Sequence, residues 1–190
     1  MIVPAPRSSR AHSPGEAVRC VAVVGNPKPE SRTLTVAAAA ATAVIEAAEL
    51  TSGCQVIDLC GLARRLLLPE PSPAVEDAIE QVTSADLVVV ASPTFKGTYT
   101  GLLKVFLDRF PPRALAGTIA LPVLVMGAPQ HALAVEVHLR PLLVELGATV
   151  PTPGLAVLES QLDNLDAVLH PWAAQVAPAL GILAAPALVQ

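Results

Sequence analysis

Five short apolar runs recur along the chain at nearly equal intervals, and this spacing limits the fold more than any other feature. The runs begin 34, 32, 33 and 29 residues apart and occupy residues 20–24, 54–57, 86–91, 119–126 and 148–150. Such an interval is typical of a βα unit, in which a strand is followed by a crossover helix. The third and fourth runs (LVVVA, IALPVLVM) are almost continuously apolar, as parallel strands covered on both faces are. We therefore expect an α/β fold with five parallel strands and helices on both sides.

Helix-length segments separate these runs. Helices are expected at residues 33–49, 73–82, 100–109, 132–146 and 162–176. The second of these has Ser72 at the N-cap, Pro73 in its first turn and apolar residues along one face, which is the pattern of a surface helix. Pro151 and Pro153 mark an edge strand or its exit, because proline has no N–H group for a strand ladder.

Length and composition predict one domain with terminal extensions. A chain of 190 residues fits a single domain, and with 53% hydrophobic and 15% charged residues it cannot be disordered over most of its length. Residues 1–17 contain several prolines and no apolar segment, so we expect a flexible N-terminal extension and not a signal peptide. The single domain is expected at residues 18–180, and a C-terminal tail at residues 181–190.

Charge and aromatic content limit the partners. The net charge of −4 gives no attraction to phosphate backbones or anionic membranes, and 3% aromatic residues disfavour a protein that stacks on bases. No apolar run reaches the roughly 18 to 20 residues of a spanning helix. Cys20, Cys54 and Cys60 lack CxxC spacing and are predicted to be free thiols, while His131 and His138 lack a clear third metal ligand. We expect a cytoplasmic protein that binds no nucleic acid, membrane or metal.

Two expected helices are apolar around more than one face. In the segments 100–109 and 132–146, leucine and valine residues spread beyond a single stripe. One face would cover the sheet and the other a second copy of the chain, so we expect a homo-oligomer; loops of the same chain are the alternative cover. Pro141 cannot donate to the carbonyl of Val137, so a kink or bulge is expected around residues 137–141.

The loop after the first run has the features of an anion site. In an open parallel sheet, ligands bind beyond the carboxyl ends of the strands. Residues 25–33 (GNPKPESRT) place Ser31, Arg32 and Thr33 at a helix start, where backbone amides and the helix dipole favour an anion such as a phosphate monoester. The loop is neither a Walker A loop nor a GxGxxG turn, which disfavours ATP and ordinary dinucleotide sites. Alternatively, Ser31 only caps the helix and Arg32 is solvated.

Two further loops follow the third and fourth runs. Residues 92–101 (SPTFKGTYTG) gather Phe95 and Tyr99 with Lys96 among small residues. Backbone amides and Phe95 are suited to frame a flat ring system, with Lys96 near negative charge on it; an ordinary turn-rich connection is the alternative. Residues 127–131 (GAPQH) are small enough to let a ring approach the backbone.

Together, the three loops resemble the NADPH-dependent FMN reductase family, and most closely the flavin reductases that supply two-component monooxygenases such as those of alkanesulfonate metabolism. The resemblance rests on residues 25–27, 31–33, 92–104 and 131–141. It implies a flavodoxin-like three-layer sandwich with strand order 2-1-3-4-5, assembled as a homodimer or homotetramer. It also implies an FMN site in which residues 31–33 hold the phosphate, residues 93–96 line the isoalloxazine and Gly127 closes the far edge. The cofactor-binding residues so implied are Asn26, Ser31, Arg32, Thr33, Pro93, Thr94, Phe95, Lys96 and Gly127.

Two positions depart from the family pattern. Phe95 stands where members often have tyrosine, so the ring is kept and a hydroxyl is lost. Val137 stands where the sulfonate branch has an aromatic residue associated with a π-helical bulge at the subunit interface.

The resemblance implies an NAD(P)H-dependent FMN reductase that transfers a hydride from NADPH, or NADH, to FMN and supplies reduced flavin to a partner monooxygenase. The cofactor carries this chemistry, so no catalytic side chain is assigned, and Lys96 with nearby amides would stabilise negative charge on the reduced flavin. Lys28 and Arg109 are candidate contacts for a coenzyme 2'-phosphate. An FMN-bound NAD(P)H:quinone or azo reductase and a flavodoxin-type electron carrier are the alternatives. The few aromatic residues disfavour a carrier and suggest one-sided, weak flavin binding.

Overall fold

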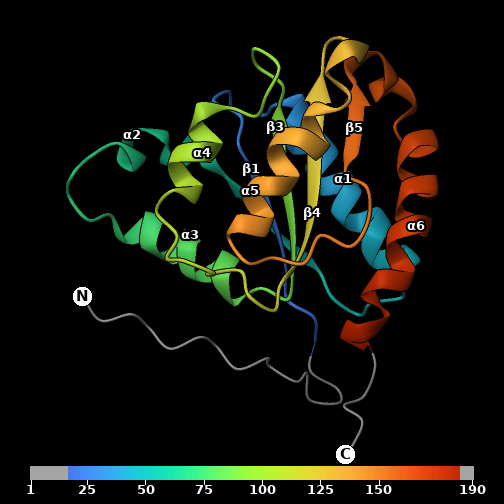
Figure 1. Ribbon diagram of the computed structural model, residues 1–190, viewed down its shortest axis with the longest axis horizontal. Helices are drawn as coiled ribbons and strands as arrows, with labels where there is room; N and C mark the ends of the chain where they lie inside the picture. Colours follow the sequence, from blue (N-terminus) through green and yellow to red (C-terminus); the bar gives the residue numbers. More distant parts are fainter. Residues whose placement is uncertain (1–16, 185–190) are drawn as a thin grey trace, which may run out of the picture.

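The computed structural model describes residues 17–184, and a five-stranded parallel sheet forms its centre (Figure 1). The strands stand in the order β2-β1-β3-β4-β5, which confirms the expected order 2-1-3-4-5. Their bounds are β1 Cys20–Val24, β2 Cys54–Asp58, β3 Leu87–Pro93, β4 Ile119–Met126 and β5 Leu155–Leu158. The order reverses between β1 and β3, and open α/β sheets bind their ligands at such a point.

Helices cover the sheet in two layers, as the sequence predicts. On one face α1 (Arg32–Ala47) and α6 (Asp166–Ala184) lie side by side, and Figure 1 shows α3 (Pro73–Ser84), α4 (Gly101–Leu107) and α5 (Arg140–Glu145) on the other. Short helical segments complete the fold: η1 Leu59–Leu62, α2 Ala63–Leu66, η2 Pro129–His131, the π-helix η3 Val135–Leu139 and η4 Glu159–Asn164. Every residue of β1, β3 and β4 is buried between the layers, because each of these strands is almost wholly apolar.

The fifth strand begins later than the sequence predicts. Residues 148–150 form only an isolated bridge, in which Thr149 pairs with Ile119, and β5 starts at Leu155. The cause lies in β4. Ala120 directs its N–H to Thr149, and N–H directions alternate along a strand, so position 122 would direct its own toward the same neighbour. Pro122 has none, and the chain leaves the ladder at residues 150–154 before it pairs again.

The helix expected at residues 132–146 is not continuous. It consists of the π-helix η3 followed by α5, and the N–H of Arg140 bonds to the carbonyl of Val135, five residues back. The expected bulge is therefore present, directly before Pro141. A π-turn accommodates the proline because the wider turn leaves room where the i−4 bond cannot form.

The last helix differs in length from its prediction. α6 begins four residues after and ends eight residues after the expected segment 162–176, and it continues through Pro171 and Pro178. Burial explains this, since one side of α6 packs against α1 through Leu169, Trp172, Ala173, Val176 and Leu180. The helix also extends four residues beyond residue 180, the predicted end of the domain. Residues 1–16 and 185–190, which hold nearly all of the predicted N-terminal extension and most of the predicted tail, lie outside the described residues.

Candidate functional site

The three candidate loops meet at the carboxyl edge of the sheet, at the top of Figure 1. Gly25 links the first two. Its N–H donates to the carbonyl of Ala91 (2.8 Å), and its carbonyl accepts the hydroxyl of Thr100, the N-cap of α4. A Cβ at position 25 would lie 2.6 Å from the Cβ of Leu103, so only glycine allows α4 to approach this closely.

The second and third loops are also neighbours. A Cβ on Gly97 would lie 3.6 Å from the Nδ1 atom of His131, so the tip of one loop faces the start of the other. The carboxyl edge therefore brings the loops after β1, β3 and β4 into one region, as the sequence predicts. Gly127 lies exposed directly after β4 in this region.

Side chains of the first loop are bound to one another. Asn26 donates from Nδ2 to the hydroxyl of Thr33 (3.0 Å) and accepts the N–H of Lys28 on Oδ1 (3.0 Å). Thr33 is almost fully buried, so its role in this structure is to orient Asn26 and the loop. The hydroxyl of Thr33 is thus engaged by Asn26, and the predicted contact of Thr33 with a phosphate stays a prediction.

The start of α1 provides the donors for an anion. Ser31 is the N-cap, and its hydroxyl oxygen accepts the N–H of Leu34 (3.2 Å). An accepting hydroxyl keeps its own proton to donate to an outside ligand. The amides of Arg32 and Thr33, in the first turn, have no acceptor within the helix. Capping and anion binding are thus compatible at Ser31 and are not alternatives.

Arg32 is turned toward a residue that sequence reasoning missed. Its guanidinium lies 2.7 Å from the carboxylate of Glu159 in η4, and the two side chains are 66% and 49% exposed. The pair borders a cavity of about 560 Å³ that is also lined by Thr35, Ser160 and Asp163. No local signal marks Glu159, because it follows Arg32 by 127 residues and only the packing of η4 beside α1 brings them together.

The loop after β3 is a tight, well-anchored turn. The N–H of Thr94 donates to Val125 (2.7 Å), and Phe95 and Thr98 form a two-residue bridge, with N–H···O distances of 2.9 and 3.3 Å. Between them Lys96 and Gly97 have positive φ angles of 54° and 83°. The backbone therefore reverses here and leaves the side chains of Phe95 and Lys96 exposed.

Three side chains near this turn, those of Thr94, Tyr99 and Ser92, differ in their contacts with the rest of the protein. The Oγ1 atom of Thr94 is buried and has no hydrogen-bond partner among the described residues, which is the condition of a polar atom that awaits a ligand. Tyr99 is half-buried and packs against the core beside α4, so part of its surface is already used by the protein. Ser92, which accepts the N–H of Thr100 (2.9 Å), holds the two ends of the loop together.

The residues present fit FMN. A capped helix start with amide donors and Arg32 suits the phosphate, and an orphaned Thr94 hydroxyl beside an exposed phenyl ring suits a flat heteroaromatic ring. Arg109 does not belong to this region. It donates to Glu76 (3.1 Å) beyond the end of α4, about 12 Å along the helix axis from Gly101.

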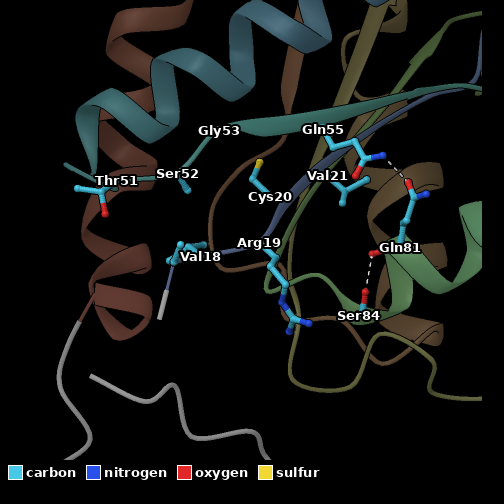
Figure 2. Close-up of a pocket in the computed structure, with 11 residues that line it drawn as sticks. Val18, Arg19, Cys20, Val21, Thr51, Ser52, Gly53, Gln55, Gln81 and Ser84 are labelled. Atoms are coloured by element: carbon cyan, nitrogen blue, oxygen red, sulfur yellow. Dashed lines mark hydrogen bonds between the residues drawn. The ribbon is translucent and has the colours of Figure 1, made fainter. Parts of the chain in front are cut away.

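A separate cavity lies at the opposite edge of the sheet. Figure 2 shows its lining at the amino ends of β1 and β2, with a volume of about 400 Å³ and the Gln55–Gln81 hydrogen bond (2.7 Å) on one wall. The thiol of Cys20 borders it. A hydrogen bond with Cys54 and burial raise the pKa of this thiol well above its ordinary value, which keeps it neutral. Cys20, Cys54 and Cys60 are all free, as predicted.

Among residues 17–184, no helix is both long and apolar enough to cross a membrane. The same residues contain no group of three histidine, cysteine, aspartate or glutamate side chains placed to hold a metal ion.

Five parallel strands in this order, between two helical layers, define the flavodoxin-like class of α/β proteins. Within that class the chain belongs to the NADPH-dependent FMN reductase family, whose model matches residues 18–163. The FMN reductase (NADPH) of Pseudomonas aeruginosa is 33% identical over 162 residues, which cover 83% of this chain and 86% of that one. The FMN reductase (NADPH) of Escherichia coli is 41% identical over 91 residues, so the match spans about half of its length (48%) and 48% of this chain.

Solved structures agree with this assignment. The apo form of an NADH:FMN oxidoreductase (EMOB) is 32% identical, with a TM-score of 0.76 over 90% of this chain and 92% of that one. An archaeal flavodoxin, at 19% identity and a TM-score of 0.54 over 83% of this chain and 99% of that one, shares the fold alone.

Proposed function

We propose that the chain is an NAD(P)H-dependent FMN reductase, which transfers a hydride from NADPH or NADH to FMN. The observation that carries the proposal is the carboxyl edge itself, where the capped start of α1 and the loops after β3 and β4 form one region within a chain of this family. Relatives named as NADPH-dependent and as NADH-dependent FMN reductases both support the reaction. They leave both coenzymes as candidates.

The proposed cofactor site has two parts. Ser31, Arg32 and the first-turn amides of α1 hold the phosphate, while Asn26 and Thr33 keep their loop in shape. Pro93, Thr94, Phe95, Lys96 and Gly127 line the isoalloxazine, where the Thr94 hydroxyl gains the partner that it lacks.

The bound flavin would supply the hydride acceptor, and the protein contributes position and charge. The backbone of Lys96 is held at the tip of its turn by the Phe95–Thr98 bridge, and its exposed ammonium group is proposed to offset negative charge on a reduced ring. No side chain is assigned as a proton donor or acceptor.

The reduced flavin is proposed to leave and to serve a flavin-dependent monooxygenase. Phe95 is exposed and Tyr99 is packed inward, so the proposed loop offers one aromatic ring, and a ring covered on one side leaves the other open to nicotinamide. Such one-sided contact favours release. Because it requires NAD(P)H, the reaction is proposed to take place in the cytoplasm.

The active form is proposed to be a homodimer or homotetramer. Three large apolar side chains are each more than half exposed in the single chain: Leu133 in the turn before η3, Val137 in η3 and Val144 in α5. A second copy of the chain would cover them.

Coenzyme oxidation with and without flavin tests the proposal. Desalted protein should oxidise NADPH or NADH slowly alone and at least tenfold faster when FMN is added. The same preparation should show no comparable rate with a quinone in the absence of flavin. A rate that is independent of added flavin, or a quinone rate that exceeds the FMN rate, would contradict the proposed reaction.

A further inference from the structure

Glu159 forms an ion pair with the guanidinium of Arg32, which is the same group that is proposed to bind the FMN phosphate. A guanidinium presents five N–H donors in a plane, and in this structure its NH1 atom is engaged by a carboxylate oxygen 2.7 Å away. A carboxylate and a phosphate monoester compete for the same planar arrangement of donors. Arg32 therefore has a second anionic partner within its own chain.

The pair is weak enough to exchange. Both side chains are largely exposed, and ion pairs in that condition contribute little to stability, because water and salt screen them. A phosphate dianion carries more charge than a carboxylate and also accepts the amides at the start of α1. The phosphate would displace Glu159, at a cost equal to the lost ion pair.

The surroundings of Arg32 strengthen the competition. Asp163 lines the same cavity as Glu159, and Glu30, two residues before Arg32, is exposed with a positive φ of 49°. Glu159 contacts the guanidinium directly, and the other two carboxylates add negative charge to the same part of the chain. Negative charge beside the proposed phosphate site opposes the binding of a dianion.

We propose that Glu159 is a positioning residue that sets the affinity for phosphorylated flavins: it holds Arg32 when no flavin is bound and must release it when the FMN phosphate enters. This inference rests on the proposed function, since it requires FMN as the ligand. Competition from Glu159 would weaken the binding of FMN and leave the binding of flavins without a phosphate unchanged.

Binding of FMN and riboflavin to Glu159→Gln tests the inference. Dissociation constants measured by quenching of flavin fluorescence should show about two- to fivefold tighter binding of FMN and unchanged binding of riboflavin. Glu46→Gln is the matched control, because it removes the same charge from an exposed glutamate near the far end of α1. Tighter riboflavin binding in Glu159→Gln, or an equal gain for FMN in Glu46→Gln, would overturn the proposal.

A double-mutant cycle separates this role from the proposed function. If Glu159 acts through Arg32, its substitution should have no effect on FMN binding in an Arg32→Ala background. An undiminished gain there would mean direct repulsion of the ligand and would contradict the proposal. If Arg32→Ala weakens FMN selectively while Glu159→Gln changes nothing, the inference fails and the phosphate site stands. If Arg32→Ala weakens both flavins equally, the phosphate site fails and the inference fails with it.

Discussion

At the residue scale, the first loop divides its polar groups between support and binding. Asn26 and Thr33 are buried and bonded to each other, so they fix the loop. Ser31 is also largely buried, but its hydroxyl accepts the N–H of Leu34 and keeps its own proton to donate, while Arg32 is exposed. All four belong to the motif in the sequence, but only the structure tells which of them are occupied by the protein itself.

Substitution of Arg32 by alanine should separate the phosphate from the ring. Charge-assisted hydrogen bonds contribute about 1.5–3 kcal/mol, and an exposed position with a competing carboxylate lies at or below the lower end of this range. We expect an increase of about tenfold in the Km for FMN, an unchanged Km for riboflavin and little change in kcat. Steady-state kinetics with both flavins measures this. Lys28→Ala, an exposed cation in the same loop, should leave both values nearly unchanged.

At the element scale, the sequence predicts a strand well where burial on both faces makes it apolar throughout. It predicts a strand poorly where a single residue in the neighbouring strand interrupts the hydrogen-bond ladder. β1, β3 and β4 were predictable because a strand buried on both faces must be apolar throughout. The start of β5 was predicted too early because Pro122, in β4, interrupts the pairing of a segment that follows it by more than 25 residues. α6 extends beyond its predicted end because packing against α1 outweighs the helix-breaking effect of two internal prolines.

The π-helix is joined by a partly buried ion pair to residues 150–154, the detour that the chain makes before β5. Arg140 donates to the carbonyls of Val150 (2.7 Å) and Thr152, and it is paired with Glu136 one turn earlier. Glu136 in turn accepts the N–H of Gly154 (2.6 Å). A Cβ on Gly154 would lie 2.4 Å from Val135, so the detour can lie against the π-helix only with glycine at this position.

Acid should loosen this junction, and Glu136→Gln should do so at neutral pH. The hydrogen bond from Arg140 lowers the pKa of Glu136 below its ordinary value of 4.5. A carboxyl group with a lowered folded pKa stabilises the fold above its unfolded value, and the contribution is lost as the pH falls through the folded value. We expect Glu136→Gln to reduce the free energy of unfolding at pH 7 by about 1–2 kcal/mol and to flatten its decline below pH 4.5.

Urea denaturation between pH 3 and pH 7 measures both effects. Glu145→Gln, an exposed glutamate at the end of α5, is the control and should behave as the unaltered chain does. The role assigned to Glu136 would be wrong if the two variants had the same stability at pH 7.

At the scale of the whole molecule, the gathering of the candidate loops could be predicted and their side-chain contacts could not. The rule that ligands bind beyond the carboxyl ends of parallel strands predicted that three loops meet at one edge of the sheet, and they do. The contact of Arg32 with Glu159 and the inward packing of Tyr99 depend on how η4 and α4 lie in three dimensions. No spacing along the chain encodes them.

Exposed apolar residues over η3 and α5 predict the assembly. Val137→Glu would bury a charge in the proposed interface, which costs several kcal/mol when unpaired. We expect the unaltered chain to have a mass of two or four times 19.5 kDa and the variant to shift to a smaller species. Size-exclusion chromatography with light scattering measures this. Leu67→Glu, an exposed leucine outside this segment, should keep the original mass; an unaltered chain that is monomeric at micromolar concentration would contradict the interface.

The central claim is that this edge of the sheet reduces FMN catalytically and releases it. Anaerobic incubation of the protein with excess NADPH or NADH and a hundredfold excess of FMN tests it directly, with flavin absorbance as the readout. We expect the entire pool of FMN to be bleached, since each chain would bind, reduce and release many flavins. Bleaching that stops at one flavin per chain would identify a protein that retains its cofactor, and absence of bleaching would refute flavin reduction altogether.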